Sequence, residues 1–148
     1  MSPHELFAIA NPVAAAAWVV LILAPLRLEW PGRLGVAVAL LMAMTYSALI
    51  GAYITQGQGD FSSLAGVARL FEHPGLLLAG WVHYLAFDLL VGVWERAEAR
   101  RIGLSQWLLA PLLFLTFMFG PIGWLLFMAV RHVRRAAQLA GAPHNLAA

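Results

Sequence analysis

The side chain best placed to do chemistry is Asp88, a carboxylate within a long and otherwise apolar stretch. A carboxylate in the middle of a bilayer costs at least about 2.5 kcal/mol, and more when it faces lipid unpaired. Such a group either carries function or belongs to a buried hydrogen-bond network that ties helices together, and the sequence leaves both interpretations open. In a water-poor cavity a carboxyl group can give or accept a proton, which makes Asp88 a candidate catalytic acid or base.

His83 is the second candidate for acid and base chemistry. Projected at about 100° per residue, Tyr84 and Asp88 share one stripe of a helix, whereas His83 lies about 140° away from Asp88. We therefore expect the two groups to flank one pocket without touching. A metal site is not predicted, because the two residues are five apart and no further ligand lies near them in the sequence.

Several further side chains are expected to contact a substrate. Asn11 precedes Pro12 in the first apolar stretch and offers both a donor and an acceptor. The other candidates are aromatic or small polar residues on predicted inward faces: Trp18, Tyr46, Trp81, Tyr84, Phe87 and Thr116. Aromatic stripes on helices more often serve helix packing than line a ligand pocket. Many aromatic rings with few polar atoms are typical of a site for a long apolar ligand.

The composition requires that most of this chain lies in lipid. Of the 148 residues, 62% are hydrophobic and 11% are charged, too few to cover a soluble domain. All nine basic residues are arginines, and they cluster at the ends of apolar stretches, which favours headgroup anchors over nucleic-acid binding. The absence of cysteine excludes disulfides and thiolate chemistry.

The charged clusters divide the chain into four apolar stretches. They predict an all-α fold, a single transmembrane domain over residues 1–148 with spans near 6–25, 34–55, 75–95 and 105–131. In the central loop, Ser62 and Ser63 precede apolar residues at helical spacing, which predicts a short helix in the membrane interface. Glu95 to Gly103 is interpreted as a charged turn, and Pro121 as a kink in the fourth span.

With four spans, both termini would lie on one side of the membrane. The arginines then divide five to four between the two sides, so the positive-inside rule gives no orientation. The expected location is the inner membrane of a bacterium. The oligomeric state stays open, with a homo-oligomer among the options.

Three stretches of sequence give the chain a family resemblance. The stretch Gly80-Trp81-Val82-His83-Tyr84-Leu85-Ala86-Phe87-Asp88 and the stretch Leu115 to Pro121, together with Phe7 to Pro12, resemble the neoxanthin-synthase-like family, the abscisic-acid-deficient-four proteins of plants and their bacterial relatives. The resemblance implies a small four-helix membrane protein of carotenoid metabolism, whose plant members are linked to isomerising an epoxide carotenoid to an allene. It implies no agreed catalytic residues.

The resulting hypothesis is a membrane-embedded enzyme that modifies a carotenoid or retinoid polyene by acid and base chemistry without a redox cofactor. The reaction would be an isomerisation, or a cleavage that gives a retinal-type product, with Asp88 and His83 as catalytic residues. Two alternatives remain. One is a small proton-coupled transporter, suggested by four spans, a membrane carboxylate and evenly divided arginines. The other is a carotenoid-binding protein without catalysis.

Overall fold

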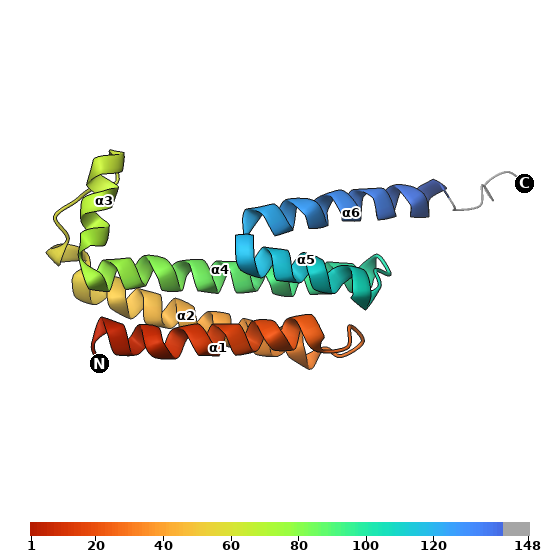
Figure 1. The fold of residues 1–148 in the computed structure, drawn as a ribbon, viewed down its shortest axis with the longest axis horizontal. Helices are drawn as coiled ribbons and strands as arrows, with labels where there is room; N and C mark the ends of the chain where they lie inside the picture. Colours follow the sequence, from red (N-terminus) through yellow and green to blue (C-terminus); the bar gives the residue numbers. More distant parts are fainter. Residues whose placement is uncertain (141–148) are drawn as a thin grey trace, which may run out of the picture.

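In the computed structural model, which describes residues 1–140, the chain forms six α-helices and one short 3-10 turn, with no β-strand in that part. Three helices are long and apolar enough to cross a membrane: α1 (Pro3–Leu23), α2 (Trp30–Tyr53) and α4 (Pro74–Arg101). They run alternately up and down and pack side by side (Figure 1). The predicted all-α membrane fold is confirmed.

Close packing among these three helices depends on small residues. Gly92 of α4 lies against the ring of Trp18 on α1, so closely that a β-carbon there would overlap the ring. Gly35 of α2 faces Val93 of α4 and the side chain of Leu21 in the same way. The absence of side chains at these two crossings lets α4 approach both neighbours, which makes α4 the central helix of the bundle.

The predicted interfacial helix is present as α3 (Leu64–Glu72), which follows the 3-10 turn η1 (Ile54–Gln56) and a short loop. It begins where expected, because the Ser63 hydroxyl accepts a hydrogen bond of 3.0 Å from the Gly66 backbone N–H. Figure 1 shows α3 turned away from the direction of the long helices at one end of the bundle.

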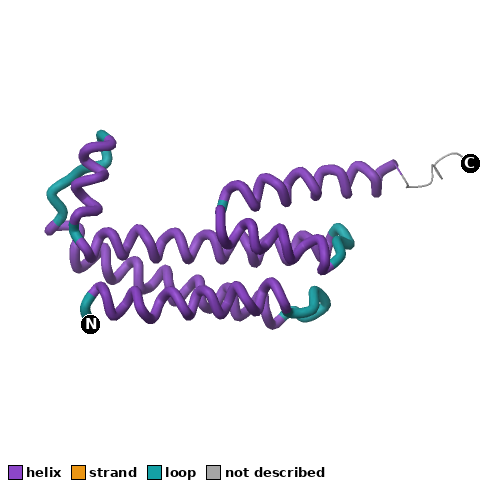
Figure 2. The backbone as a smooth tube through the Cα atoms, in the orientation of Figure 1, coloured by secondary structure: helices purple, strands orange, loops and turns teal. Residues whose placement is uncertain are grey.

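The predicted fourth span over 105–131 is wrong as a single helix. The chain forms α5 (Gln106–Phe119) and α6 (Pro121–Ala140), two helices that pack against each other. At about 1.5 Å per residue, the 14 residues of α5 reach about 21 Å, short of a hydrocarbon core of about 30 Å. Figures 1 and 2 show α6 folded back along α5 to the end of the bundle from which α5 started.

The reversal occurs because Gly120 and Pro121 end one helix and begin the next, where only a kink was predicted. Gly120 has φ of +49°, a left-handed conformation that glycine adopts without steric cost, and Pro121 occupies the first position of α6. Gly123 then packs directly on the backbone of Thr116, so closely that a side chain there would overlap it. The glycines of the 116–123 stretch thus build the hairpin, named here the α5–α6 hairpin.

The stretch from Glu95 to Arg101, predicted as a turn, continues α4 instead. Arg96 is buried and its guanidinium donates to four backbone carbonyls around the α1–α2 turn, at distances of 2.6 to 3.3 Å. Glu98 is buried as well and accepts a hydrogen bond of 2.6 Å from Arg131 on α6. These partners stabilise charged residues in the last turns of α4, which sequence patterning alone would assign to a loop.

The hairpin also determines at which end of the bundle α6 finishes. Met1 lies at one end of the bundle, and the end of α6 at Ala140 lies at the other, so the prediction that both termini share one side is not supported (Figure 1). Eight of the nine arginines now gather at the end formed by the α1–α2 turn, the α4–α5 turn and the second half of α6, and only Arg69 on α3 lies at the opposite end.

Candidate functional site

Asp88 lies at the middle of α4, at the depth where the α5–α6 hairpin reverses. A β-carbon at Gly120 would lie 3.1 Å from Asp88 Oδ2 and 3.4 Å from Oδ1, so the carboxyl group rests directly against the bare glycine. The Oδ2 atom is buried and has no hydrogen-bond partner among the described residues. A buried polar atom without a partner costs about 1 to 3 kcal/mol, so it requires a functional or structural reason.

A structural reason would be capping of α6, which begins one residue beyond Gly120. The amino end of a helix has free N–H groups and a positive partial charge, and a carboxylate there is stabilised. A cap would accept hydrogen bonds from those N–H groups, but within residues 1–140 no backbone N–H donates to Asp88. The carboxyl group therefore lies near a positive helix end while its acceptor atom stays available.

Tyr84 and Trp81 continue the Asp88 stripe along α4 toward the end of the bundle that carries Met1. Tyr84 is one helical turn from Asp88 on the same face of α4, and the ring centroids of Trp81 and Tyr84 are 5.6 Å apart. Trp81 donates a hydrogen bond of 2.7 Å from its indole N–H to the Asn11 side-chain oxygen on α1. This bond orients the indole and connects α1 to the stripe, so three of the predicted contact residues lie together near Asp88.

An open groove extends this stripe outward. It has a volume of about 310 Å³ and lies between the first turns of α1 and α4, with Phe7, Leu77 and Trp81 among its lining residues. Phe7 and Trp81 have ring centroids 6.1 Å apart. Because α5 ends at Phe119 and α6 turns back from Pro121, the α5–α6 hairpin does not extend along this half of α4, and the groove stays open on that side. From Leu77 to Asp88 the stripe measures about 17 Å at about 1.5 Å per residue.

A second buried carboxylate, Glu95, lies two helical turns beyond Asp88 on the same face of α4. It is fully buried, and the Thr116 hydroxyl on α5 lies 3.0 Å from each of its two oxygens. Sequence reasoning placed Glu95 at the end of the span and treated Asp88 as the one carboxylate inside it, which was wrong. The sequence does contain a signal for this position of Glu95. Trp81, Asp88 and Glu95 are spaced seven residues apart, and residues seven apart share a helix face.

His83 lies on another side of α4, and the structure does not bring it to Asp88. Its ring contacts Phe87 at 4.6 Å and Tyr46 of α2 at 5.4 Å between centroids. Together with Tyr46 and residues of α3 it lines a separate groove of about 210 Å³ between α2, α3 and α4. Two predicted contact residues, Tyr46 and Phe87, thus accompany His83, and the single shared pocket is not formed.

Trp18, the last of the predicted contact residues, belongs to the hydrophobic core. It is 1% exposed and packs between Gly92 of α4 and Phe117 of α5, with a ring separation of 5.4 Å from Phe117. Its role is to fill the centre of the bundle. Thr116 likewise contacts Glu95 and reaches no groove.

The described residues contain no group of three or more histidine and acidic side chains that could hold a metal ion. This finding does not test the expectation that no metal and no cofactor takes part, which stays a prediction. What the site offers is a half-buried carboxyl group with an unpaired oxygen, a neighbouring phenol and an aromatic groove open to lipid.

Three helices that are long and apolar enough to span a membrane, packed with a helical hairpin, define the class of polytopic helical membrane proteins. A family comparison is more specific. Residues 5–127 match the family described as ABA DEFICIENT 4-like, and the chain belongs to that family. The resemblance noted in the sequence is thereby confirmed. No curated protein and no solved structure matches the chain.

Proposed function

We propose that this protein is a membrane-embedded enzyme that modifies a carotenoid or retinoid polyene by proton transfer at Asp88. The observation that carries the proposal is the buried, unpartnered Oδ2 of Asp88, on a stripe of α4 that continues through Tyr84 to Trp81, where an open groove begins. A carboxyl group in that position can exchange a proton with a ligand that enters sideways from lipid. Membership of the ABA DEFICIENT 4-like family supports the choice of a carotenoid.

The reaction favoured by these residues is an isomerisation. Conversion of an epoxide to an allenic alcohol adds a proton to the epoxide oxygen and removes one from a carbon atom, so the composition of the substrate is unchanged. Asp88 can transfer one of these protons, and the Tyr84 phenol beside it can hydrogen-bond the oxygen. The Asn11 amide, held by Trp81, lies further along the same stripe and is a second polar contact for a hydroxylated end group.

The transporter alternative keeps the membrane carboxylate but has lost the two other observations that motivated it, the four spans and the evenly divided arginines. An even division of arginines depended on a fourth span, and the α5–α6 hairpin places eight of nine arginines at one end of the bundle. Such a strong asymmetry fixes one orientation, whereas dual-topology exporters insert both ways. We therefore retain the enzyme as the main hypothesis and carotenoid binding without catalysis as the alternative that experiment must separate from it.

The test is pigment analysis of the purified full-length protein. We expect the protein expressed in carotenoid-producing cells to carry a carotenoid and to change the pigment profile of the membranes, as measured by chromatography of extracts. Asp88→Asn should retain the bound pigment but leave the profile as in cells without the protein. Binding by the unaltered protein without any change of profile would reduce the proposal to a carotenoid-binding protein, and a colourless protein would refute it.

A further inference from the structure

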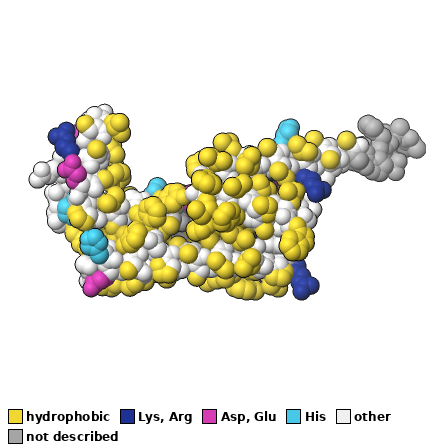
Figure 3. All heavy atoms as spheres, in the orientation of Figure 1, with side chains coloured by type: hydrophobic (Ala, Val, Ile, Leu, Met, Phe, Trp, Pro, Cys, Tyr) yellow, Lys and Arg dark blue, Asp and Glu magenta, His cyan; other side chains and the backbone are white. Residues whose placement is uncertain are grey.

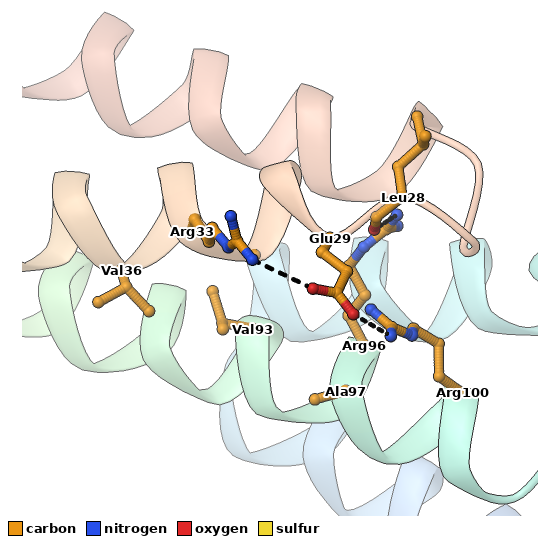
Figure 4. Close-up of a pocket in the computed structure, with 9 residues that line it drawn as sticks. Leu28, Glu29, Arg33, Val36, Val93, Arg96, Ala97 and Arg100 are labelled. Atoms are coloured by element: carbon orange, nitrogen blue, oxygen red, sulfur yellow. Dashed lines mark hydrogen bonds and ion pairs between the residues drawn. The ribbon is translucent and has the colours of Figure 1, made fainter.

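A cleft remote from Asp88 combines arginine side chains with an apolar trough. It has a volume of about 390 Å³ and lies between the first turns of α2 and the last turns of α4. Figure 4 shows Glu29 between Arg33 and Arg100 at one end of the cleft, with Val36 and Val93 at the other. The proposed polyene site uses none of these residues.

The charged end of the cleft holds two exposed guanidinium groups close together. Glu29 accepts a hydrogen bond of 3.2 Å from Arg33 and one of 2.9 Å from Arg100. In the described structure each of these arginines donates one N–H in this way, and neither donates to any other side chain. A guanidinium has five N–H groups, so most donors of both arginines remain available to an anion.

The third arginine of the cleft has a structural role. Arg96 lies behind Glu29 and donates to the backbone carbonyls of the α1–α2 turn, which fixes that turn and the start of α2. The lining of the cleft therefore contains three arginines and one glutamate, which gives it a net positive charge. Burial of the guanidinium away from solvent strengthens its field at the cleft.

The other end of the cleft is apolar and leads toward the middle of the membrane. Gly32, Val36, Val93 and Ala97 line it, and a β-carbon at Gly32 would come no closer than 3.9 Å to Val93. Small side chains at these positions leave a trough along the crossing of α2 and α4. An amphipathic ligand with a compact anionic head and a hydrocarbon chain fits such a cleft.

The position of the cleft within the membrane identifies the class of ligand. It lies at the end of the bundle that carries eight arginines, whereas Glu5, Asp60 and Glu72 lie at the other end with Arg69. The positive-inside rule assigns the arginine end to the cytoplasmic side. The leaflet on that side supplies anionic phospholipids, which basic clusters at span ends attract.

We propose that this cleft binds one anionic phospholipid, with its phosphate on the N–H groups of Arg33 and Arg100 that Glu29 leaves free and one acyl chain in the trough beside Val36 and Val93. Glu29 pairs with both guanidinium groups and so holds them at the same end of the cleft. The lipid would join the start of α2 to the end of α4 and so stabilise the bundle at its arginine end.

The experiment measures binding of phosphatidylglycerol to the full-length protein in mixed detergent micelles, with phosphatidylcholine as the neutral comparison. We expect the double variant Arg33→Gln/Arg100→Gln to weaken phosphatidylglycerol binding by about tenfold or more. The double variant Arg27→Gln/Arg134→Gln removes the same charge from the same end of the bundle outside the cleft, and it should bind as the unaltered protein does. Equal losses in the two variants would overturn the proposal in favour of a general electrostatic effect.

A second variant tests the trough without changing any charge. Val36→Trp should fill it and weaken phosphatidylglycerol binding, while soluble glycerol phosphate should bind weakly to every variant and to the unaltered protein. Tight binding of glycerol phosphate, or full lipid affinity in Val36→Trp, would show that no acyl chain occupies the trough and would refute the lipid site. Elution of each variant as a folded species on size-exclusion chromatography is the control, and lipid retention in native mass spectrometry is the independent measurement.

Discussion

The two sides of α4 differ in what covers them. On the side of Asp88 the α5–α6 hairpin reverses at Gly120 against a half-buried carboxyl group, next to a stripe of aromatic residues. On the side of His83, helices α2 and α3 bound a mostly apolar groove, and the imidazole makes tilted contacts with the rings of Tyr46 and Phe87. Figure 3 shows a hollow between α3 and the hairpin, with a hydrophobic surface along the middle of the molecule.

A single helix thus separates two ionisable groups five residues apart into distinct environments. The first has a buried oxygen without a hydrogen-bond partner among the described residues, and the second contacts two aromatic rings and lines an apolar groove. We therefore assign chemistry to the Asp88 side and binding or packing to the His83 side. Variants on each side, together with the topology of the chain, can disprove that division.

The hairpin that creates the Asp88 side requires the start of α1 and the end of α6 to lie on opposite sides of the membrane. Since the protein contains no cysteine, single cysteine variants report accessibility without background labelling. Ser2→Cys should react with a membrane-impermeant reagent from one side only, and Leu139→Cys from the other. Trp107→Cys at the start of α5 is the control and should share the side of Leu139; labelling of Ser2 and Leu139 from one side would restore a four-span topology and remove the exposed carboxyl group.

Asp88→Asn should reduce the conversion of the polyene by at least about a hundredfold, the usual contribution of a general acid or base. The amide preserves shape and hydrogen-bonding capacity, so folding should be retained, as judged by thermal unfolding in detergent. His83→Asn is the matched variant on the other side of α4 and should change the rate by less than about threefold. If the histidine variant loses activity and the aspartate variant keeps it, the assignment of the two sides is reversed.

Gly120→Ala should lower both activity and stability, because a β-carbon there meets the Asp88 carboxyl group and the left-handed backbone is strained. The conformational cost alone is about 1 to 2 kcal/mol. Gly103→Ala is the control, because Gly103 also has a positive φ, of +63°, but a β-carbon added there would meet nothing within 4 Å. Similar losses of stability in the two variants, with loss of activity only in Gly120→Ala, would support a contact between position 120 and the Asp88 carboxyl group. Equal activity in both variants would argue against that contact.

Thr116→Val removes the hydroxyl that donates to Glu95 and leaves a buried carboxyl group with fewer partners. We expect a loss of about 1 to 3 kcal/mol in the free energy of unfolding. Glu95→Gln should restore most of that loss in the double variant, since a neutral amide costs less to bury than a carboxylate. Additive losses in the double-mutant cycle would show that the two side chains do not interact in the folded protein.

The smallest effect is expected in the loop before α3, on the His83 side. The Ser62 side chain and backbone N–H donate to Asp60, which lowers the pKa of that carboxyl group from its usual value of 3.8. A lowered pKa in the folded state means that the contribution to stability is complete above that usual value and is lost as the pH falls through the lowered value. Between about pH 5 and 8, Asp60→Asn should therefore leave the pH profile of activity unchanged, and a displaced profile would mean that the α3 side takes part in catalysis.

The membrane class, the three spans and the helix at Ser63 were predictable because each rests on a local signal. Apolar stretches of span length and a serine before an apolar stripe both keep their meaning regardless of tertiary structure. The position of Asp88 near Tyr84 followed from helical periodicity alone. These features required no knowledge of which helix packs against which.

The hairpin and the buried charges at the end of α4 were not predictable in this way. Gly120 and Pro121 permit either a kink or a full reversal, and the choice depends on the contact of Gly123 with the backbone of Thr116. Arg96 and Glu98 resemble loop residues by composition, and their burial depends on carbonyl groups and arginines far away in the sequence. The separation of His83 from Asp88 was visible in the projection, but only the position of the hairpin decides that they occupy different sites.

The half-depth hairpin makes the protein asymmetric across the bilayer. With α1, α2 and α4 placed across a bilayer, α5 and α6 lie beside them only on the arginine side of Gly120, within the described residues. The molecule is thus a wedge, broad in one monolayer and narrow in the other, and lipids of the narrow side fill the volume above Gly120. A wedge of this shape relieves stress in curved bilayers and is stressed in flat ones, so membrane curvature becomes a physical variable that acts on the space directly beside Asp88.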